Sequence, residues 1–568
     1  MVISDGLPGP RPMAGSDTGE TGNPARSNVN GMQSEHPPNS RDDAFVDEDT
    51  EAFVRRTLCS QNTLLGAGEK GTGRSSPRPI SDLLPPLTSS NAIDLQLYAL
   101  VSIIIREFVQ TWYTRITPDQ VFVNEVIRII AHCTRALEQR LREVDLEALL
   151  LDEIPDILSA HMAAFRLAKR ETTRQQALIS DPRVLYHSMH PHPALSPVPT
   201  EDQPSSIVEQ RENESTWRQL LVQGTLAVIL PTDDFENACL RSLVAEILAE
   251  MIIGNGVSGK ACEGWLLCES ISKVIDGIQP ATTGTERKIQ EAHRSVRHNA
   301  MLHQMSNSEP TQPEPARPAT MVSLASVLGL FWSLIQYGIL VLSALRGLLM
   351  ALSGASPLAT RCVTRASSLS AGGEDRERAF AEGREPVIKR PILSMKLWSC
   401  ASQLVELDLR MPWLAGFASL LHWLALAGPG RVGDTDGILD RFLSHTVQTR
   451  ILNPASVPAL LRTIRLAIFP NNALGPARQP PSPEEVKRIK KQCAQQLGAF
   501  LPAKAAVLLF ATEGTASQCE QIEGLLDCLD DAYINKHLVF QIVELVLLRL
   551  VPELGKSGVG ELIGDRLG

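Results

Sequence analysis

The chain has 568 residues, a net charge of −10 and ten cysteines that are scattered singly along it. This length corresponds to about three or four domains. The acidic balance argues against non-specific nucleic-acid binding, which needs a basic surface, and isolated cysteines indicate free thiols in a reducing compartment rather than a disulfide framework.

The first 90 residues are rich in Gly, Pro, Ser, Asn and Asp and show almost no apolar periodicity. Such a segment buries too little apolar surface to offset its chain entropy. We therefore predict a disordered leader over residues 1–90. Its first residues contain no apolar stretch of the kind that a secretory signal needs.

Residues 91–280 are predicted to form a helical domain. Between Asp94 and Gln110, apolar residues recur with the 3.6-residue period of a helix, and Thr117 and Pro118 supply the cap and first-turn proline of a second helix. Alternating apolar and polar residues, which indicate strands, are rare throughout the chain. We therefore expect an all-α fold class.

The most unusual segment lies between Arg317 and Arg346, where no residue is charged. It follows a polar linker at 281–317, and we predict a long apolar helix over residues 318–352, which is enough for a bilayer span of about 20 residues. The remaining domains are predicted by composition and helical periodicity. They are a flexible linker at 353–390, a second helical domain at 391–554 and a tail at 555–568. We expect the two helical domains to pack together around the apolar helix.

The apolar helix has two kinds of surface. Its small and polar residues recur at spacings of three, four and seven, which places them on one stripe that permits close helix packing. This predicted packing stripe consists of Ser326, Gly329, Ser333, Gln336, Ser343 and Gly347. The broad apolar sides are predicted to face lipid or a membrane and consist of Leu328, Phe331, Trp332, Ile335, Ile339 and Leu342.

Three placements of the apolar helix stay open: it lines a lipid cavity or lies in a membrane interface, it spans a membrane, or it belongs to a protein core. A single span would put the two helical domains on opposite sides of the membrane. A return through the second uncharged run, Met411–Gly430, would translocate a loop with many basic residues, against the positive-inside rule. We therefore predict the cavity or interface placement.

No motif favours an enzyme. The run from Gly254 to Ala261 resembles a phosphate-binding loop, but it follows a helical pattern and has Ala where a Mg²⁺-binding hydroxyl belongs. The histidines at 187, 190 and 192 lie in a proline-rich segment, which we interpret as a flexible polar loop rather than a zinc site. No catalytic residue, metal or cofactor is predicted.

Two segments resemble known domains. Residues Leu97–His161 resemble the start of a PXA (PX-associated) domain, and the C-terminal block resembles the C-terminal domain of sorting nexins, with its signature between Ile534 and Leu554. The resemblance implies that 91–280 is a PXA-like domain and that 391–554 is a sorting-nexin-C-like domain. The motif residues that carry the resemblance are Trp112, Tyr113, Pro155, His161, Asn535, Lys536, His537, Pro552 and Glu553. The chain is thus similar to sorting nexins that carry both domains in this order, although it has no recognisable PX or RGS domain.

This resemblance implies a non-enzymatic protein that binds or transfers lipid, or tethers membranes, at organelle contact sites. The expected partners are phospholipid or fatty acyl chains, an organelle membrane surface and trafficking proteins, with no nucleic acid. The expected location is the cytoplasmic face of the endoplasmic reticulum or of its endosome and vacuole contacts. Two alternatives stay open: an endosomal or vacuolar trafficking adaptor, and an integral tether that spans the membrane at 318–345.

Overall fold

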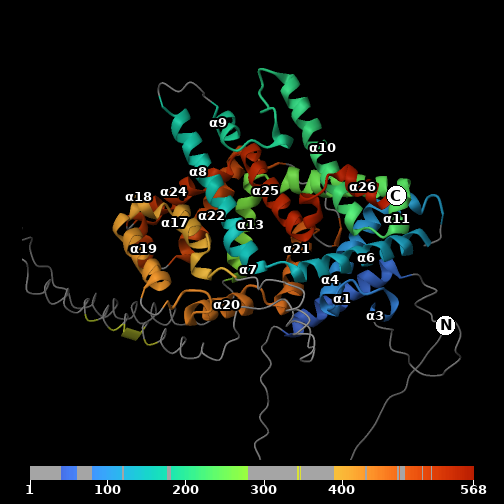
Figure 1. Cartoon of the computed structure of the whole chain (residues 1–568), viewed down its shortest axis with the longest axis horizontal. Helices are drawn as coiled ribbons and strands as arrows, with labels where there is room; N and C mark the ends of the chain where they lie inside the picture. Colours follow the sequence, from blue (N-terminus) through green and yellow to red (C-terminus); the bar gives the residue numbers. More distant parts are fainter. Residues whose placement is uncertain are drawn as a thin grey trace, which may run out of the picture.

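The protein is almost entirely helical in the computed structural model (Figure 1). The structure describes residues 40–59, 80–117, 121–174, 181–278, 389–428, 431–469, 472–473, 480–501, 503–512 and 514–567, together with positions 335, 339, 342, 343 and 346. Among these residues there is no strand beyond one isolated bridge between Thr200 and Gln203. The predicted all-α class is confirmed.

The helices before the central gap begin with α1 (Ser40–Leu58) and α3 (Ile80–Leu83). The next group is α4 (Asn91–Ile104), η1 (Ile105–Gln110), α5 (Thr111–Tyr113), α6 (Val121–Glu143), α7 (Leu146–Ala148), η2 (Leu149–Glu153) and α8 (Ile154–Thr172). The last group is α9 (Pro182–Met189), η3 (Pro193–Leu195), α10 (Pro204–Ile229), α11 (Thr232–Glu236), α12 (Ala238–Glu246), η4 (Ile247–Lys260) and α13 (Gly264–Ile278).

The helices after the gap begin with η6 (Ile392–Ser394), α17 (Leu397–Leu404), α18 (Leu407–Arg410), α19 (Pro412–Ala427) and α20 (Ile438–Arg450). They continue with η7 (Pro454–Ser456), α21 (Val457–Ile468), α22 (Pro483–Phe500), α23 (Ala503–Phe510) and α24 (Thr515–Leu526). The chain ends with η9 (Asp527–Leu529), α25 (Ala532–Leu550), η10 (Pro552–Gly555) and α26 (Val559–Leu567).

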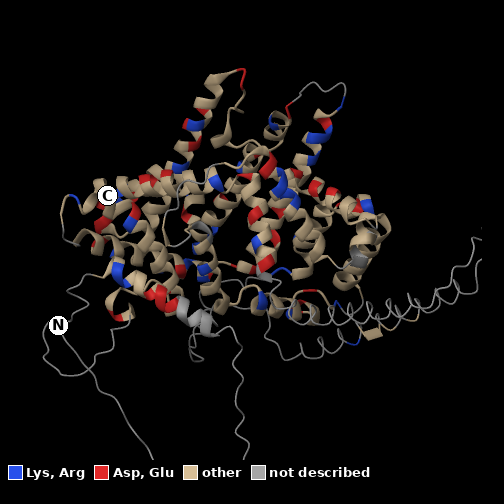
Figure 2. Ribbon diagram, turned by 180° about the vertical axis from the view of Figure 1, so that it is seen from behind, with Lys and Arg blue, Asp and Glu red and all other residues tan. Residues whose placement is uncertain are grey.

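Helices from the two halves of the sequence interleave in one body. Helix α13 packs along α22, α4 along α21, and α8 along α17 and α25. Cys268 of α13 and Cys493 of α22 are buried in one apolar cluster with Phe510. The segments on either side of residues 279–388 therefore share their cores. Acidic and basic residues are interspersed along the helices of both segments (Figure 2).

The prediction of a disordered leader over residues 1–90 is wrong for α1 and for residues 80–90. Helix α1 packs against α4, and its residues Phe53, Val54 and Leu58 are buried in the same apolar cluster as Leu87. The prediction failed because it averaged composition over 90 residues, whereas one short helix needs only three or four apolar residues on one face to be buried. Residues 1–39 and 60–79 lie outside the described residues.

The segment 555–568, predicted as a tail, contains α26, which packs on α10. Its residues Leu562 and Ile563 contact the buried cluster around Val222. The segment is short and rich in Gly, which obscures the amphipathic pattern of α26 in the sequence.

Most of the predicted apolar helix lies outside the described residues. Ile335, Ile339, Leu342 and Ser343 are helical, and Ile339 and Leu342 are exposed. The other predicted stripe and lipid-facing residues are not described, so the expected packing of both domains around this helix stays a prediction. No helix in the described part of the chain is both long and apolar enough to cross a membrane.

Candidate functional site

Helix α25 joins the two halves of the protein through two of its motif residues. The Asp531 carboxylate caps the helix by accepting from the backbone N–H groups of Tyr533 and Ile534. Asn535 is fully buried, and its amide donates to the carbonyl oxygens of Cys262 at 2.9 Å and Leu529 at 2.7 Å. Because Cys262 lies in the first half and Leu529 in the second, Asn535 ties the two halves together.

Lys536 points to a buried polar network at the same interface. Its ammonium group pairs with the Glu214 carboxylate of α10 at 2.9 Å, and Arg218 pairs with both Glu214 and Glu250. Glu250 belongs to η4. This π-helix also contains the glycine-rich run from Gly254 to Lys260, and Ala261 follows directly after it. This run therefore forms part of a π-helix that packs on α10, which is not the geometry of a phosphate-binding loop.

A histidine cluster, formed by His161, Tyr186, His187, Tyr533 and His537, fills the space between α8, α9 and α25. The imidazole Nδ1 of His187 lies 3.0 Å from Nε2 of His537, and the Tyr186 hydroxyl lies 2.9 Å from Nδ1 of His161. The Tyr533 hydroxyl donates to the Leu195 carbonyl at 2.6 Å. The predicted motif residues His161 and His537, which are 376 positions apart in the sequence, thus meet in one site.

The cluster favours neutral imidazoles. Burial lowers the pKa of His161 to about 4, and the nearby Cys528 backbone opposes this shift only in part. Burial also lowers the pKa of His537 to about 3, and the neighbouring His187 and His192 add to this effect. His537 Nδ1 donates to the Tyr533 carbonyl at 3.1 Å, so its Nε2 is the acceptor for His187.

The interpretation of the proline-rich segment as a flexible polar loop is wrong for residues 181–195. Asp181 caps helix α9, which carries His187, and His192 is buried against Trp217 and Phe540. The available signal was the run Asp181-Pro182, which is a helix-start pattern. No group of three His, Cys, Asp or Glu side chains among the described residues is arranged to hold a metal ion.

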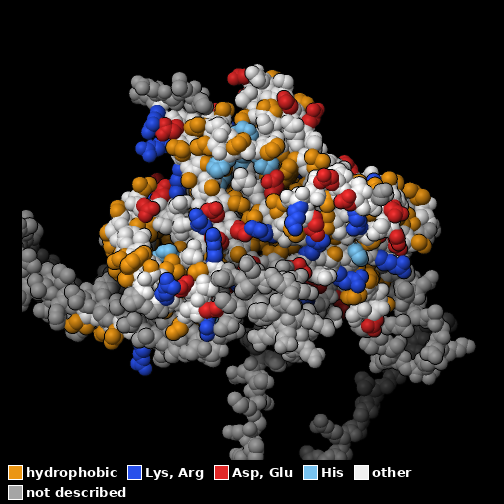
Figure 3. Space-filling model, viewed as in Figure 1, with side chains coloured by type: hydrophobic (Ala, Val, Ile, Leu, Met, Phe, Trp, Pro, Cys, Tyr) orange, Lys and Arg blue, Asp and Glu red, His pale blue; other side chains and the backbone are white. Residues whose placement is uncertain are grey.

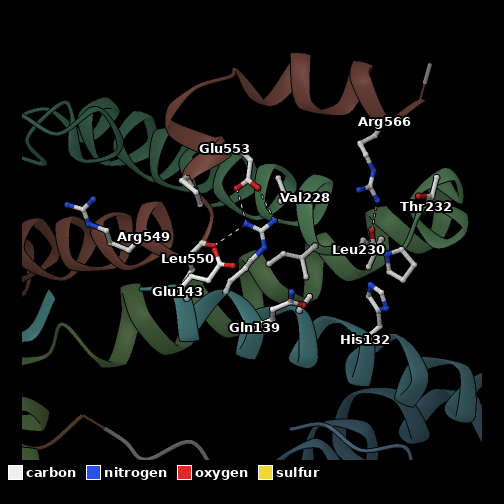
Figure 4. Close-up of a pocket in the computed structure, with 15 residues that line it drawn as sticks. His132, Gln139, Glu143, Val228, Leu230, Thr232, Arg549, Leu550, Glu553 and Arg566 are labelled. Atoms are coloured by element: carbon white, nitrogen blue, oxygen red, sulfur yellow. Dashed lines mark hydrogen bonds and ion pairs between the residues drawn. The ribbon is translucent and has the colours of Figure 1, made fainter. Parts of the chain in front are cut away.

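A cavity of about 730 Å³ lies where α6, the end of α10, α25 and α26 converge (Figure 4). The predicted motif residues Pro552 and Glu553 line it. The Glu553 carboxylate accepts two hydrogen bonds from Arg140, at 2.9 and 3.0 Å, and this arginine also donates to the Leu550 carbonyl. Arg140 thereby holds the pKa of Glu553 below its usual range.

We expect a small coupling between Arg140 and Glu553. A double-mutant cycle with Arg140→Ala and Glu553→Ala should give about 1 kcal/mol, because the pair is bidentate but partly exposed. Urea unfolding of the four proteins measures it. The Arg128–Glu125 pair is highly exposed and serves as the control, with an expected coupling near zero. Equal coupling energies in the two pairs would show that the position of Arg140 and Glu553 between the two halves does not strengthen their ion pair.

The remaining predicted motif residues lie apart from the histidine cluster. Trp112 and Tyr113 form an aromatic group with Phe122 at the end of η1 and α5, and Trp112 is partly exposed. Pro155 is buried in the first turn of α8, directly after the π-helix η2, and a local π-helical turn accommodates a proline within a continuous helix. These three residues shape the helical domain rather than the interface.

An apolar arm, residues 389–428, extends from this body and comprises η6, α17, α18 and α19. Three ion pairs attach the start of the arm to the first half of the chain. Lys389 pairs with an aspartate that caps α7, Arg390 with one in η2, and Lys396 with one in α8. Many apolar side chains of α18 and α19 are exposed, and the most exposed of them is Leu409 of α18, at 80%. Hydrophobic side chains gather over α18 and α19 at the left of Figure 3. The prediction of lipid-facing residues did not include this surface, although the notable absence of charge in Met411–Gly430 pointed to it.

Comparisons with known proteins place the first half of the chain in a family. The PXA domain family matches residues 90–274. PXA domain protein 1 of Schizosaccharomyces pombe is 30% identical over 156 residues, which cover 28% of this chain and 29% of that protein. An uncharacterized protein of Saccharomyces cerevisiae is 21% identical over 463 residues, which cover 80% of this chain and 79% of that protein.

Sorting nexin-13 of Homo sapiens is 25% identical over 171 residues, which cover 29% of this chain and 17% of that protein. This chain therefore matches less than a third of sorting nexin-13 and of PXA domain protein 1. No solved structure matches it. The likeness of its second half to the sorting-nexin C-terminal domain stays a prediction. The chain contains a PXA domain over residues 90–274, and this region is similar to the sorting nexins.

Proposed function

We propose that this protein is a non-enzymatic lipid-binding protein of membrane trafficking that docks on an organelle membrane. The observation that carries the proposal is the apolar arm, whose large side chains are exposed although the rest of the protein has ordinary buried cores. Contiguous apolar surfaces of this kind mark sites of interaction with proteins or membranes. The relation to PXA-domain proteins and sorting nexins favours a membrane.

The finer role that fits best is lipid transfer or tethering at contacts of the endoplasmic reticulum with endosomes or vacuoles. It is supported by the interleaving of the PXA domain with the second half, because such a joint unit can carry a lipid and a membrane-docking surface together. A trafficking adaptor is the second candidate, and the exposed Trp112, which lies on a different element from the arm, favours it.

Vesicle flotation of the full chain tests the proposal. Wild-type protein should float with phosphatidylcholine–phosphatidylserine vesicles, and native mass spectrometry should detect bound phospholipid or fatty acid. Leu409→Asp should lower the membrane partition coefficient roughly tenfold, because a charge resists transfer from water into an apolar phase.

Val208→Asp is the matched control, because Val208 is an exposed apolar residue on α10, outside the arm. This variant should float as the wild type does. Wild-type protein that remains in the aqueous fraction and carries no lipid would refute the proposed function.

A further inference from the structure

Helix α19 is unusual for a helix on a protein surface. Its 16 residues include no Asp, Glu, Lys or Arg, and only Ala415 is buried. The six large side chains that it exposes are between 43% and 63% accessible, and they are Trp413, Phe417, Leu420, Leu421, Trp423 and Leu424. Such a helix is normally found in a protein core or in a membrane.

The arrangement of these side chains shows how α19 would meet a partner. At 100° per residue, the six side chains cover an arc of about 160°, which is wider than the roughly 100° stripe by which a helix packs on one neighbour. The opposite side faces the protein, where Nε2 of His422 donates to the Leu393 carbonyl at 2.6 Å. Acyl chains are a fluid medium and cover so broad an arc without a shaped groove.

The length of α19 decides its orientation. Sixteen residues extend about 24 Å, which is less than the hydrocarbon core of about 30 Å. The helix is therefore too short to cross the bilayer along its normal. Apolar helices that lie in the membrane plane bury one face to a depth of about 5–10 Å. Trp413 and Trp423 sit near the two ends of α19, and indole rings prefer the boundary between headgroups and acyl chains.

The charge of the surrounding arm matches an anionic membrane. The whole chain has a net charge of −10, yet residues 389–431 contain five basic and only two acidic residues. The basic residues are Lys389, Arg390, Lys396, Arg410 and Arg431. Each of the five forms an ion pair with a carboxylate, but the side chains of Arg390, Lys396 and Arg431 stay more than half exposed. Because surface ion pairs are weak, anionic headgroups such as phosphatidylserine can compete for these three side chains.

We propose that α19 lies in the plane of an anionic membrane, with its Trp413–Leu424 face immersed among the acyl chains of one leaflet. This inference rests on the proposed function and names the partner of the arm. Two other partners could cover the same face: a second copy of this chain, or its own apolar segment 318–345. The experiment below distinguishes both from a membrane.

Quenching of tryptophan fluorescence by brominated lipids measures the immersion. Full-length protein on phosphatidylcholine–phosphatidylserine vesicles with brominated acyl chains should lose a large share of the emission of Trp413 and Trp423. The Trp413→Phe/Trp423→Phe variant should float equally well, because Phe preserves the apolar surface, but it should show much weaker quenching. Phe417→Asp/Leu420→Asp should float at least tenfold less than the wild type, and Val208→Asp should float unchanged.

The outcomes distinguish this inference from the proposed function. Equal quenching in wild-type protein and in the double Trp→Phe variant would overturn the placement of α19. Wild-type protein that floats without quenching would also overturn it, while the proposed function would stand. A lipid-free dimer that Phe417→Asp/Leu420→Asp converts to a monomer would assign the face to a second copy. Protection of Trp413 from aqueous quenchers without vesicles, lost on deletion of 318–345, would assign it to that segment.

Discussion

The Gly264→Ala variant is expected to lose about 3 kcal/mol of stability, because a new methyl group would collide with a backbone atom that cannot move aside. A Cβ at position 264 would lie 2.1 Å from the carbonyl oxygen of Leu529. Gly264 begins α13 in the PXA domain and Leu529 ends η9 in the second half. The variant therefore probes the interface between the two halves. Urea unfolding measures the change in free energy.

Gly524→Ala is the control for this experiment. Gly524 lies within α24, and a Cβ there would meet no atom within 4 Å. Alanine should stabilise the helix by about 0.5–1 kcal/mol, because glycine loses more backbone entropy on folding. If Gly264→Ala were as stable as the wild type, α13 and η9 would not approach each other as the structure shows.

Acidification from pH 7.5 to pH 5.0 is expected to destabilise the protein through its histidine cluster. His161 and His537 have pKa values of about 4 and about 3 in the folded protein, against an ordinary value of 6.5. The unfolded chain therefore binds more protons below pH 6.5, and stability falls as the pH decreases from 6.5 toward these folded values. At pH 5 the loss is on the order of 2 kcal/mol for each histidine.

Urea unfolding at pH 7.5, 6.5, 5.5 and 5.0 measures this loss, in a range where most carboxylates stay ionised. His161→Asn keeps a polar atom near the Tyr186 hydroxyl but cannot be protonated, so its stability should depend less steeply on pH. His132 is exposed and lies outside the cluster, so His132→Gln serves as the control for a histidine replacement. A wild-type slope near zero between pH 6.5 and 5.0 would contradict the assignment of neutral, buried imidazoles.

Local helix signals were strong enough to be read from the sequence. The run Ser482-Pro483-Glu484-Glu485 predicts a helix start, and the structure shows a full capping box in which Ser482 and Glu485 bond to each other's backbone. The resemblance to a PXA domain was also visible, because the motif residues that carry it lie within one continuous segment, Leu97–His161. These features depend on residues that are close in the chain.

Long-range partners could not be read in the same way. His161 and His537 were noted as separate motif residues, but only the packing of α8 against α25 brings them into one cluster. The close approach at Gly264 depends on a carbonyl group 265 positions away. The burial of α1 depends on the apolar surface of α4 and its neighbours, which its own few apolar residues do not reveal.

The sequence by itself determined the helical class, the PXA domain and the two uncharged segments at 318–345 and 411–430, because periodicity, motif spacing and charge are local properties. Only the tertiary structure decided that the two halves interleave and that α19 remains exposed. Burial depends on which surfaces meet, and an apolar helix has the same sequence whether it fills a core or faces a membrane. In the structure, an arc of large apolar side chains on α19 remains exposed. The composition of the helix alone could not show this exposure.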